Sequence, residues 1–389
     1  MAILDGFTVI EFSEVYQAPV AAQVLGDFGA TVIKVERPET GDLLRHMDAH
    51  ANAHGLMCSY FAAANRNKES VVLNLKTAAG KEAARRMAQN ADVLIHNYRP
   101  GAMERLGLGY EDLSALNARL VYASATGYGE SGPLSHLGGQ DLAIQSLSGI
   151  AMGSADADGS PRLTNAPSID FCSGMVLAQG IVLALLERER SGRGQKVSTS
   201  LLDTAVAMQG LEASSYLMYN QPTKWFDRTL NFMFQTRDGW ITLLGFFRPN
   251  PLQLICDALG IPDETQLPGM ETLAQQMPHR ERLAEKFRPY FLELTTDEAL
   301  SRLQARDLIC MPILDLDDTL QLEQVRHNGM VATMPLDGQP DCEVVNNPVR
   351  LSRTPASIRR GPPALGKDTA AVLKRYGFAE SEISEITSK

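Results

Sequence analysis

Short strand-like segments alternate with helix-like segments through the first half of the chain, and this alternation constrains the fold more than any other feature. Apolar runs of strand length occupy residues 8–12, 31–36, 71–75, 91–96, 120–124 and 196–198. Segments with helical periodicity occupy residues 19–28, 77–89, 169–189 and 201–218. Strands that alternate with helices of about 10–15 residues form βαβ units. The sequence therefore predicts an α/β fold with a largely parallel sheet.

The character of the sequence changes near Tyr219. From there to about residue 317, aromatic residues, a hairpin-like turn at 237–241 and several helical patterns follow one another. This mixture predicts a second, smaller α+β domain. The segment 335–363 is rich in proline, and extended proline-rich segments often cross from one domain to another.

Composition favours an ordinary soluble protein. Hydrophobic residues make up 44% of the chain and charged residues 21%, and the net charge of −10 argues against a general nucleic-acid binder. Five scattered cysteines without a Cys-x-x-Cys pair fit a reducing compartment. The N-terminus does not read as a signal peptide, and no stretch is expected to reach the ~20 apolar residues of a membrane span. We therefore expect a cytoplasmic protein that binds neither membrane nor nucleic acid.

Several familiar cofactor motifs are missing or broken. Residues 361–367 have P-loop spacing, but Asp368 replaces the metal-binding hydroxyl residue and two prolines remove N–H donors. No Gly-x-Gly-x-x-Gly follows the first strand, so no nicotinamide cofactor is expected. His46, His50 and His54 have helical spacing, but few carboxylates lie near them, so no metal is expected.

Asp141 is the leading catalytic candidate. It follows Gly138, Gly139 and Gln140 in a glycine-rich region that begins after the strand at 120–124. Ligands of open α/β sheets bind where strands end, and a carboxylate there acts as a nucleophile or a base. The alternative is that Asp141 only caps a helix that starts at Leu142.

Basic residues gather around the ends of the first strands. In an acidic protein, such a cluster suits an anionic ligand such as a nucleotide phosphate, although each residue also fits a solvated sheet rim. The cluster comprises Lys34, Arg37, Arg45, Arg66, Lys68, Lys76, Arg99 and Arg105.

Several motifs, taken in order, resemble the family III CoA-transferases, also called the CaiB/BaiF family. Each motif is weak alone, but their order and spacing are specific, and the resemblance covers essentially the whole chain. The motifs are Gly26 to Pro38, Asn65 to Lys68, Asn97 to Gly101, Gly127 to Glu130, Asp141, Gly192 to Gln195 with Leu202-Asp203, and Leu365-Gly366 with Thr369.

The resemblance implies a fold and a set of site residues. It implies a Rossmann-like large domain of residues 1–218 together with 330–389, a small domain of residues 219–329, and an interlocked, ring-like homodimer. It makes Asp141 the nucleophile, and we add the N–H groups of Gly138, Gly139 and Gln140 as candidate oxyanion donors. The positions that it assigns to CoA are Tyr16, Gln17, Ala18, Arg37, Leu73, Asn97, Tyr98 and Arg105.

The implied reaction moves CoA from an acyl-CoA to a free carboxylic acid through an aspartyl-CoA thioester on Asp141. The same fold carries α-methylacyl-CoA racemases, in which the residue before the matching aspartate is usually His. Here that residue is Gln140, which cannot exchange a proton, so His136 would have to substitute. A non-catalytic CoA-binding protein is a third possibility, and Glu130 is interpreted as loop polarity.

Substrate identity depends on the segment 232–250. Arg248 suits the second carboxylate of a dicarboxylic acid, whereas Phe246 and Phe247 would favour an aromatic or branched acid. The sequence weakly favours small dicarboxylates with succinyl-CoA as the donor.

Overall fold

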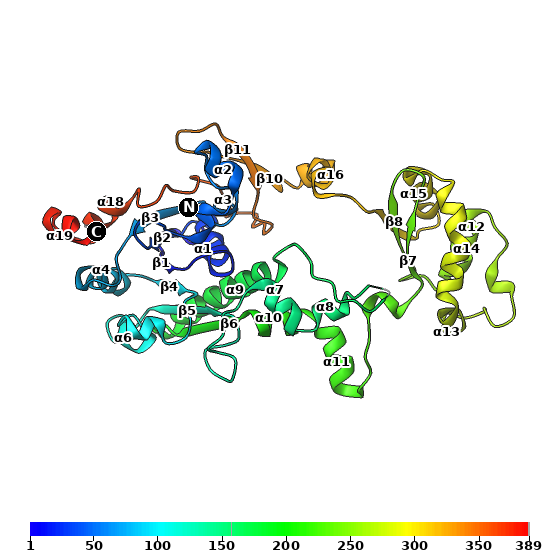
Figure 1. Ribbon diagram of the computed structural model, residues 1–389, viewed down its shortest axis with the longest axis horizontal. Coiled ribbons are helices and arrows are strands. Elements are labelled where there is room, and N and C mark those ends of the chain that lie inside the picture. Colours follow the sequence, from blue (N-terminus) through cyan, green and yellow to red (C-terminus); the bar gives the residue numbers. More distant parts are fainter. Residues whose placement is uncertain (157, 388–389) are drawn as a thin grey trace. The chain divides into compact units, whose positions relative to one another are not determined.

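The computed structural model describes residues 1–156 and 158–387 (Figure 1). The chain forms two compact units, one of residues 1–209 with 329–389 and one of residues 210–328. The first unit carries the cavities discussed below, and the second has its own sheet and core.

A six-stranded parallel sheet forms the centre of the first unit, which confirms the predicted α/β class. Its strand order is β3-β2-β1-β4-β5-β6. Strands β2 and β3 are added on one side of β1 and strands β4 to β6 on the other, so the order of connection reverses between β1 and β4. In open α/β sheets this reversal opens a crevice at the carboxyl ends of the strands. The strands are β1 (Thr8–Phe12), β2 (Thr31–Glu36), β3 (Lys68–Val72), β4 (Val93–His96), β5 (Val121–Thr126) and β6 (Lys196–Ser200).

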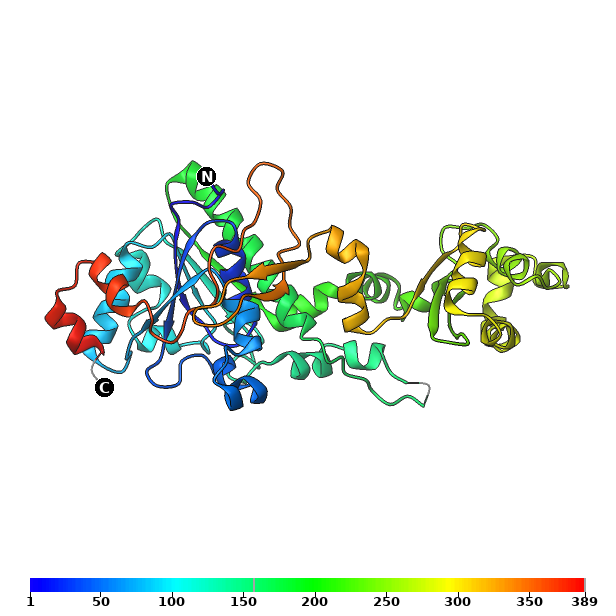
Figure 2. The same cartoon turned by 90° about the horizontal axis from the view of Figure 1, so that it is seen from above.

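Helices cover both faces of this sheet (Figure 2), and alternate strand residues point to opposite sides. Val9 packs with α1 and α9 on one face, while Ile10 packs with α4 on the other. The α-helices of this unit are α1 (Gln17–Asp27), α2 (Ala49–His54), α3 (Ser59–Asn65), α4 (Ala78–Gln89), α5 (Ala102–Arg105), α6 (Tyr110–Ser114), α7 (Asp141–Leu147), α8 (Ile150–Gly153), α9 (Ser168–Ser191), α10 (Leu201–Met208), α18 (Thr369–Arg375) and α19 (Glu380–Thr387).

Helix α9 corrects one sequence expectation. It is 24 residues long and, by length and composition alone, apolar enough to span a membrane, contrary to the expectation that no stretch approaches that limit. Its buried side, which includes Leu177 and Ile181, packs against α1 and the central strands. The apolar residues on this side of the helix are thus part of the core of the first unit.

The proline-rich C-terminal segment returns to the first unit. Its strands β10 (Val331–Met334) and β11 (Cys342–Val345) form an antiparallel pair. Downstream, Asn67 N–H donates to Arg360 O at 3.1 Å and Asp368 N–H donates to Ser70 O at 3.0 Å. The end of the chain is thus fixed along the β3 edge of the sheet.

The second unit is an antiparallel sheet packed on helices. The strands β7 (Asn231–Gln235), β8 (Trp240–Leu244) and β9 (Ile309–Pro312) pair in that order. Phe232 and Phe234 of β7 pack against Phe287 of α14 in its core. The helices are α11 (Gly210–Tyr219), α12 (Pro251–Leu259), α13 (Leu273–Gln276), α14 (Arg280–Leu292), α15 (Thr296–Gln304), α16 (Leu316–Gln321) and α17 (Glu323–His327).

Candidate active site

A cavity of about 460 Å³ lies where β1, β4 and β5 end, beside the reversal of strand order. The loop after β1 contributes Tyr16 and Gln17, and the loop after β4 contributes Asn97 and Tyr98. This is the position at which open α/β sheets bind ligands.

Asp141 is the first residue of α7, and its carboxylate is 3% exposed. Oδ1 accepts a hydrogen bond from Gln145 Nε2 at 2.6 Å, and Oδ2 accepts from the N–H groups of Ile169 at 2.8 Å and Asp170 at 3.0 Å. Asp141 therefore caps the first turn of α9 rather than a helix starting at Leu142. It is not among the residues that line the cavity.

A second carboxylate, that of Asp170, was not among the site residues predicted from the sequence. It lies in the first turn of α9, lines the cavity and is 8% exposed. Within residues 1–156 and 158–387, its side-chain oxygens accept no hydrogen bond. Burial, and secondarily the charge of Asp141, raises the pKa of Asp170 to about 7, against the effect of the helix dipole.

Two glycine-rich segments meet at the cavity wall. A Cβ atom on Gly139 would lie 2.3 Å from the Cα of Gly127, so the two backbones touch and neither position has room for a side chain. All three residues predicted as oxyanion donors, Gly138, Gly139 and Gln140, line the cavity. In the part of the chain that the structure describes, their N–H groups have no acceptor, which leaves them available to a ligand.

The residues predicted to hold CoA fall mostly into two cavities. Tyr16, Gln17 and Asn97 line the first, and Arg37 and Leu73 line a second cavity of about 470 Å³. Tyr98 lines both and therefore lies on the wall between them. Ala18 is fully buried in α1, and Arg105 is exposed on α5; neither lines either cavity.

The predicted basic cluster separates into two groups. Lys34, Lys68, Arg45 and Arg66 are paired with carboxylates inside the fold and cannot neutralise a ligand. Lys76, Arg37, Arg99 and Arg105 remain exposed. The cluster is therefore half structural, contrary to its interpretation as one anion-binding patch.

Lys34, one of the buried residues of this cluster, supports the loop after β1 through Asp42. Val15 has a φ of 67°, an unusual value for a β-branched residue, and its N–H donates to Asp42 Oδ1 at 3.1 Å. Asp42 in turn pairs with fully buried Lys34 at 2.9 Å. This buried ion pair therefore helps to position the loop that carries Tyr16 and Gln17.

The predicted substrate residues lie in the second unit. Arg248 forms an ion pair with the Asp307 carboxylate, and its Nε donates to Asp307 O at 2.8 Å. Phe246 stacks on Trp225 with a ring-centroid distance of 5.2 Å. The charge of Arg248 thus already has a partner within its own unit.

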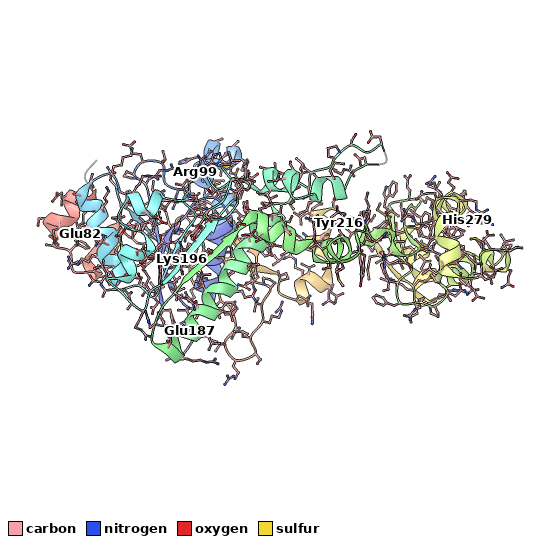
Figure 3. The ribbon with its side chains drawn as sticks, turned by 90° about the horizontal axis from the view of Figure 1, so that it is seen from below. Glu82, Arg99, Glu187, Lys196, Tyr216 and His279 are labelled. Carbon is pink, nitrogen blue, oxygen red and sulfur yellow. The ribbon has the colours of Figure 1, made fainter. Side chains whose placement is uncertain are left out.

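Two other candidates have local roles. Glu130 accepts from Ser124 Oγ at 2.7 Å and pairs at 2.8 Å with Lys196, which is labelled in Figure 3, and Glu130 does not line the cavity. His54 Nδ1 lies 2.8 Å from the carbonyl of His50 on α2. Among the described residues, no three His, Cys, Asp or Glu side chains gather as metal ligands.

Comparisons with known proteins agree on one family. The family described as CoA-transferase family III matches residues 4–369. The chain is 31% identical to a mouse succinyl-CoA:glutarate CoA-transferase, over 96% of this chain and 86% of the relative. It is also 31% identical to an Escherichia coli formyl-CoA:oxalate CoA-transferase, over 98% of each chain.

Solved structures give the same result. A CaiB/BaiF family protein from Brucella suis is similar with a TM-score of 0.85 and 27% identity, over 96% of this chain and 99% of that one. A Mycobacterium tuberculosis protein is similar with a TM-score of 0.85 and 31% identity, over 95% and 99% of the two chains.

Proposed function

The chain belongs to CoA-transferase family III, and we propose that this enzyme carries CoA from an acyl-CoA to a carboxylic acid on the side chain of Asp170. The observation that carries this assignment is the position of two neighbouring carboxylates. Asp170 lines the cavity and accepts no hydrogen bond from any described residue, whereas both oxygens of Asp141 already accept hydrogen bonds. The proposed nucleophile therefore differs from the one expected from the sequence.

The environment of Asp170 suits a nucleophile. A carboxylate is more basic, and a better nucleophile, when burial and a like charge raise its pKa. The pKa of Asp170, at about 7, leaves a substantial ionised fraction at neutral pH. Asp141 contributes to this shift and holds the backbone of Asp170, so we assign it a positioning role.

The reaction proceeds in balanced steps. The Asp170 carboxylate attacks the acyl-CoA thioester, the C–S bond breaks, and a mixed anhydride and CoA thiolate form. The thiolate attacks the aspartyl carbonyl, which releases the donor acid and leaves an aspartyl-CoA thioester. The acceptor carboxylate attacks this thioester and releases the thiolate. The thiolate then attacks the acceptor carbonyl, which gives the new acyl-CoA and frees Asp170.

The surrounding residues match the needs of these steps. Each attack develops an oxyanion, and the free N–H groups of the segment 138–140 are suited to stabilise it. The second cavity, with Arg37 and Lys76 on its wall, suits the phosphate end of CoA. Tyr98, shared by both cavities, lies between the two ends of the cofactor.

We propose small dicarboxylic acids as substrates, with succinyl-CoA as a donor. Two relatives carry glutarate and oxalate in their names, and both are dicarboxylic acids. We further propose that the enzyme is a cytoplasmic homodimer. Exposed apolar residues of α9, among them Leu183 and Leu186, support a surface that a second copy covers.

Adduct mapping tests the assignment of the nucleophile. Wild type, Asp170→Ala and Asp141→Ala would each be incubated with succinyl-CoA, formyl-CoA and other acyl-CoAs and examined by intact-protein mass spectrometry. We expect a hydroxylamine-labile CoA adduct in wild type, mapped to the peptide that contains Asp170. The adduct should be absent in Asp170→Ala and form more slowly in Asp141→Ala. An adduct on Asp141 would restore the sequence-based assignment.

A further inference from the structure

Arg99, labelled in Figure 3, lies in the loop after β4, and it lines the same cavity as Asp170. Its side chain approaches the glycine-rich wall, since a Cβ atom on Gly138 would lie 3.0 Å from Arg99 Nη2. Among the residues that the structure describes, its guanidinium has no ion-pair or hydrogen-bond partner. An unpaired guanidinium on a cavity wall is available to an anionic ligand.

The charge of the cavity explains why a cation is needed there. Asp170 lines the cavity, and Asp141 lies directly behind it. An incoming carboxylic acid is itself an anion, so both carboxylates repel it. Of the described residues that line this cavity, Arg99 is the one cation.

We infer that Arg99 selects dicarboxylic acceptors by binding the carboxylate that does not react. This inference rests on the proposed CoA transfer at Asp170. One carboxylate of the acceptor must remain free to attack the aspartyl thioester. A guanidinium holds the other carboxylate with two parallel hydrogen bonds, which fixes its orientation as well as its position.

The phosphates of CoA are the main competing ligand for Arg99. The second cavity has Lys76 and Arg37 on its wall to meet a phosphate, Arg37 being paired with Glu14 at 2.6 Å, and Tyr98 lies on the wall between this cavity and that of Asp170. Arg99 and Gly138 line the cavity of Asp170 and do not line the second cavity. This arrangement favours the acceptor acid as the ligand of Arg99.

The test separates the two halves of the reaction in Arg99→Met and Arg99→Lys. Adduct formation from formyl-CoA, whose acyl group has no second carboxylate for Arg99 to bind, reports the first half. Release of the purified adduct by succinate or glutarate, compared with butyrate or valerate, reports the second half. We expect adduct formation within about threefold of wild type in Arg99→Met. We expect its KM for the two dicarboxylates to rise about 10- to 100-fold, with little change for the monocarboxylates. Arg99→Lys should recover part of the loss.

Arg248→Met is the matched control, because it removes the arginine that the sequence interpretation selected. A selective loss of dicarboxylates in Arg248→Met, with none in Arg99→Met, would overturn the inference. So would equal losses for mono- and dicarboxylates, or loss of adduct formation in Arg99→Met, which would assign Arg99 to CoA. Failure of wild type to form any adduct would instead refute the proposed transfer at Asp170.

Discussion

Asp141 Oδ2 accepts a hydrogen bond from the backbone N–H of Asp170 at 3.0 Å, so one carboxylate fixes the backbone of another. The same contact brings the charge of Asp141 close enough to raise the pKa of Asp170. Two carboxylates in different environments commonly take different chemical roles. Here the hydrogen-bonded carboxylate of Asp141 holds a backbone segment, and the one on the cavity wall, Asp170, is the nucleophile that we propose.

The first prediction concerns pH. Only the ionised form of Asp170 is a nucleophile, so the single-turnover rate of adduct formation should rise with pH and level off above about 7. Asp141→Asn removes a neighbouring negative charge and should lower the pKa of Asp170. Its rate profile should therefore move to lower pH. Stopped-flow measurements between pH 5 and 9 provide the check, and an unchanged midpoint in Asp141→Asn would contradict the electrostatic coupling.

The second prediction concerns stability. The pKa of Asp170 is raised on folding, so its ionisation destabilises the native state as pH rises from about 4 to about 7. Asp170→Asn cannot ionise and should be more stable than wild type at pH 8, by about 2–4 kcal/mol before any loss from packing. At pH 4.5 the difference should fall to about 1 kcal/mol, because the carboxyl is protonated in the native state but still largely ionised in the unfolded chain.

Urea unfolding at both pH values measures this effect. Asp141→Ala is the contrasting variant, because it leaves the N–H groups of Ile169 and Asp170 without their acceptor. It should be less stable than wild type at pH 8, by about 1–3 kcal/mol. If Asp170→Asn lost stability at pH 8 as well, the argument from ionisation would be wrong.

The third prediction concerns the crossing of two glycine-rich segments. A Cβ on Gly139 would meet the Cα of Gly127 at 2.3 Å, so Gly139→Ala must displace one backbone from the other. We expect at least a 100-fold loss in the rate of adduct formation, because the N–H groups of this segment would move from the cavity. Gly153→Ala is the matched control, since a Cβ there meets nothing within 4 Å. Equal rates for the two variants would show that the crossing does not position the site.

Much of the fold was predictable because the central strands are apolar on both faces. The segments 8–12 and 31–36 coincide with β1 and β2. The third strand was expected at 71–75 but runs from Lys68 to Val72. A lysine normally indicates an exposed position, but the amino group of Lys68 is fully buried and pairs with Glu11 at 2.8 Å. Hydrophobic periodicity does not reveal a partner so distant in the chain.

The helix expected at 201–218 is also divided. It forms α10 and α11, with Gln209 between them. Gln209 Nε2 donates to Ser148 O at 2.9 Å, a contact with a segment about 60 residues away. Helical periodicity runs through this break and therefore does not predict it.

The sequence predicts where the site lies, whereas the choice between its two carboxylates depends on contacts that only the fold supplies. The glycine-rich segment and the loops after β1 and β4 do meet at one cavity. The sequence drew attention to Asp141 because glycines precede it. Asp170, by contrast, lies near the start of a mostly apolar helix and resembles an ordinary acidic residue of a first helical turn. In the sequence, Asp170 stands out only as a charged residue near the start of a helix that must be largely buried. Only the fold shows that a cavity lies beside Asp170.

The last prediction concerns the exposed side of α9. Leu183 and Leu186 are 57% and 54% exposed, although the opposite side of the same helix packs on the sheet. We expect wild type to be a dimer by light scattering, and Leu183→Glu combined with Leu186→Glu to shift it toward monomer, because a charge buried at an apolar contact is strongly unfavourable. Glu187→Gln with Glu189→Gln is the control on the same helix, and it should leave the dimer intact. A wild-type monomer, or a monomer that binds neutral lipid vesicles, would instead show that something other than a second copy covers this surface.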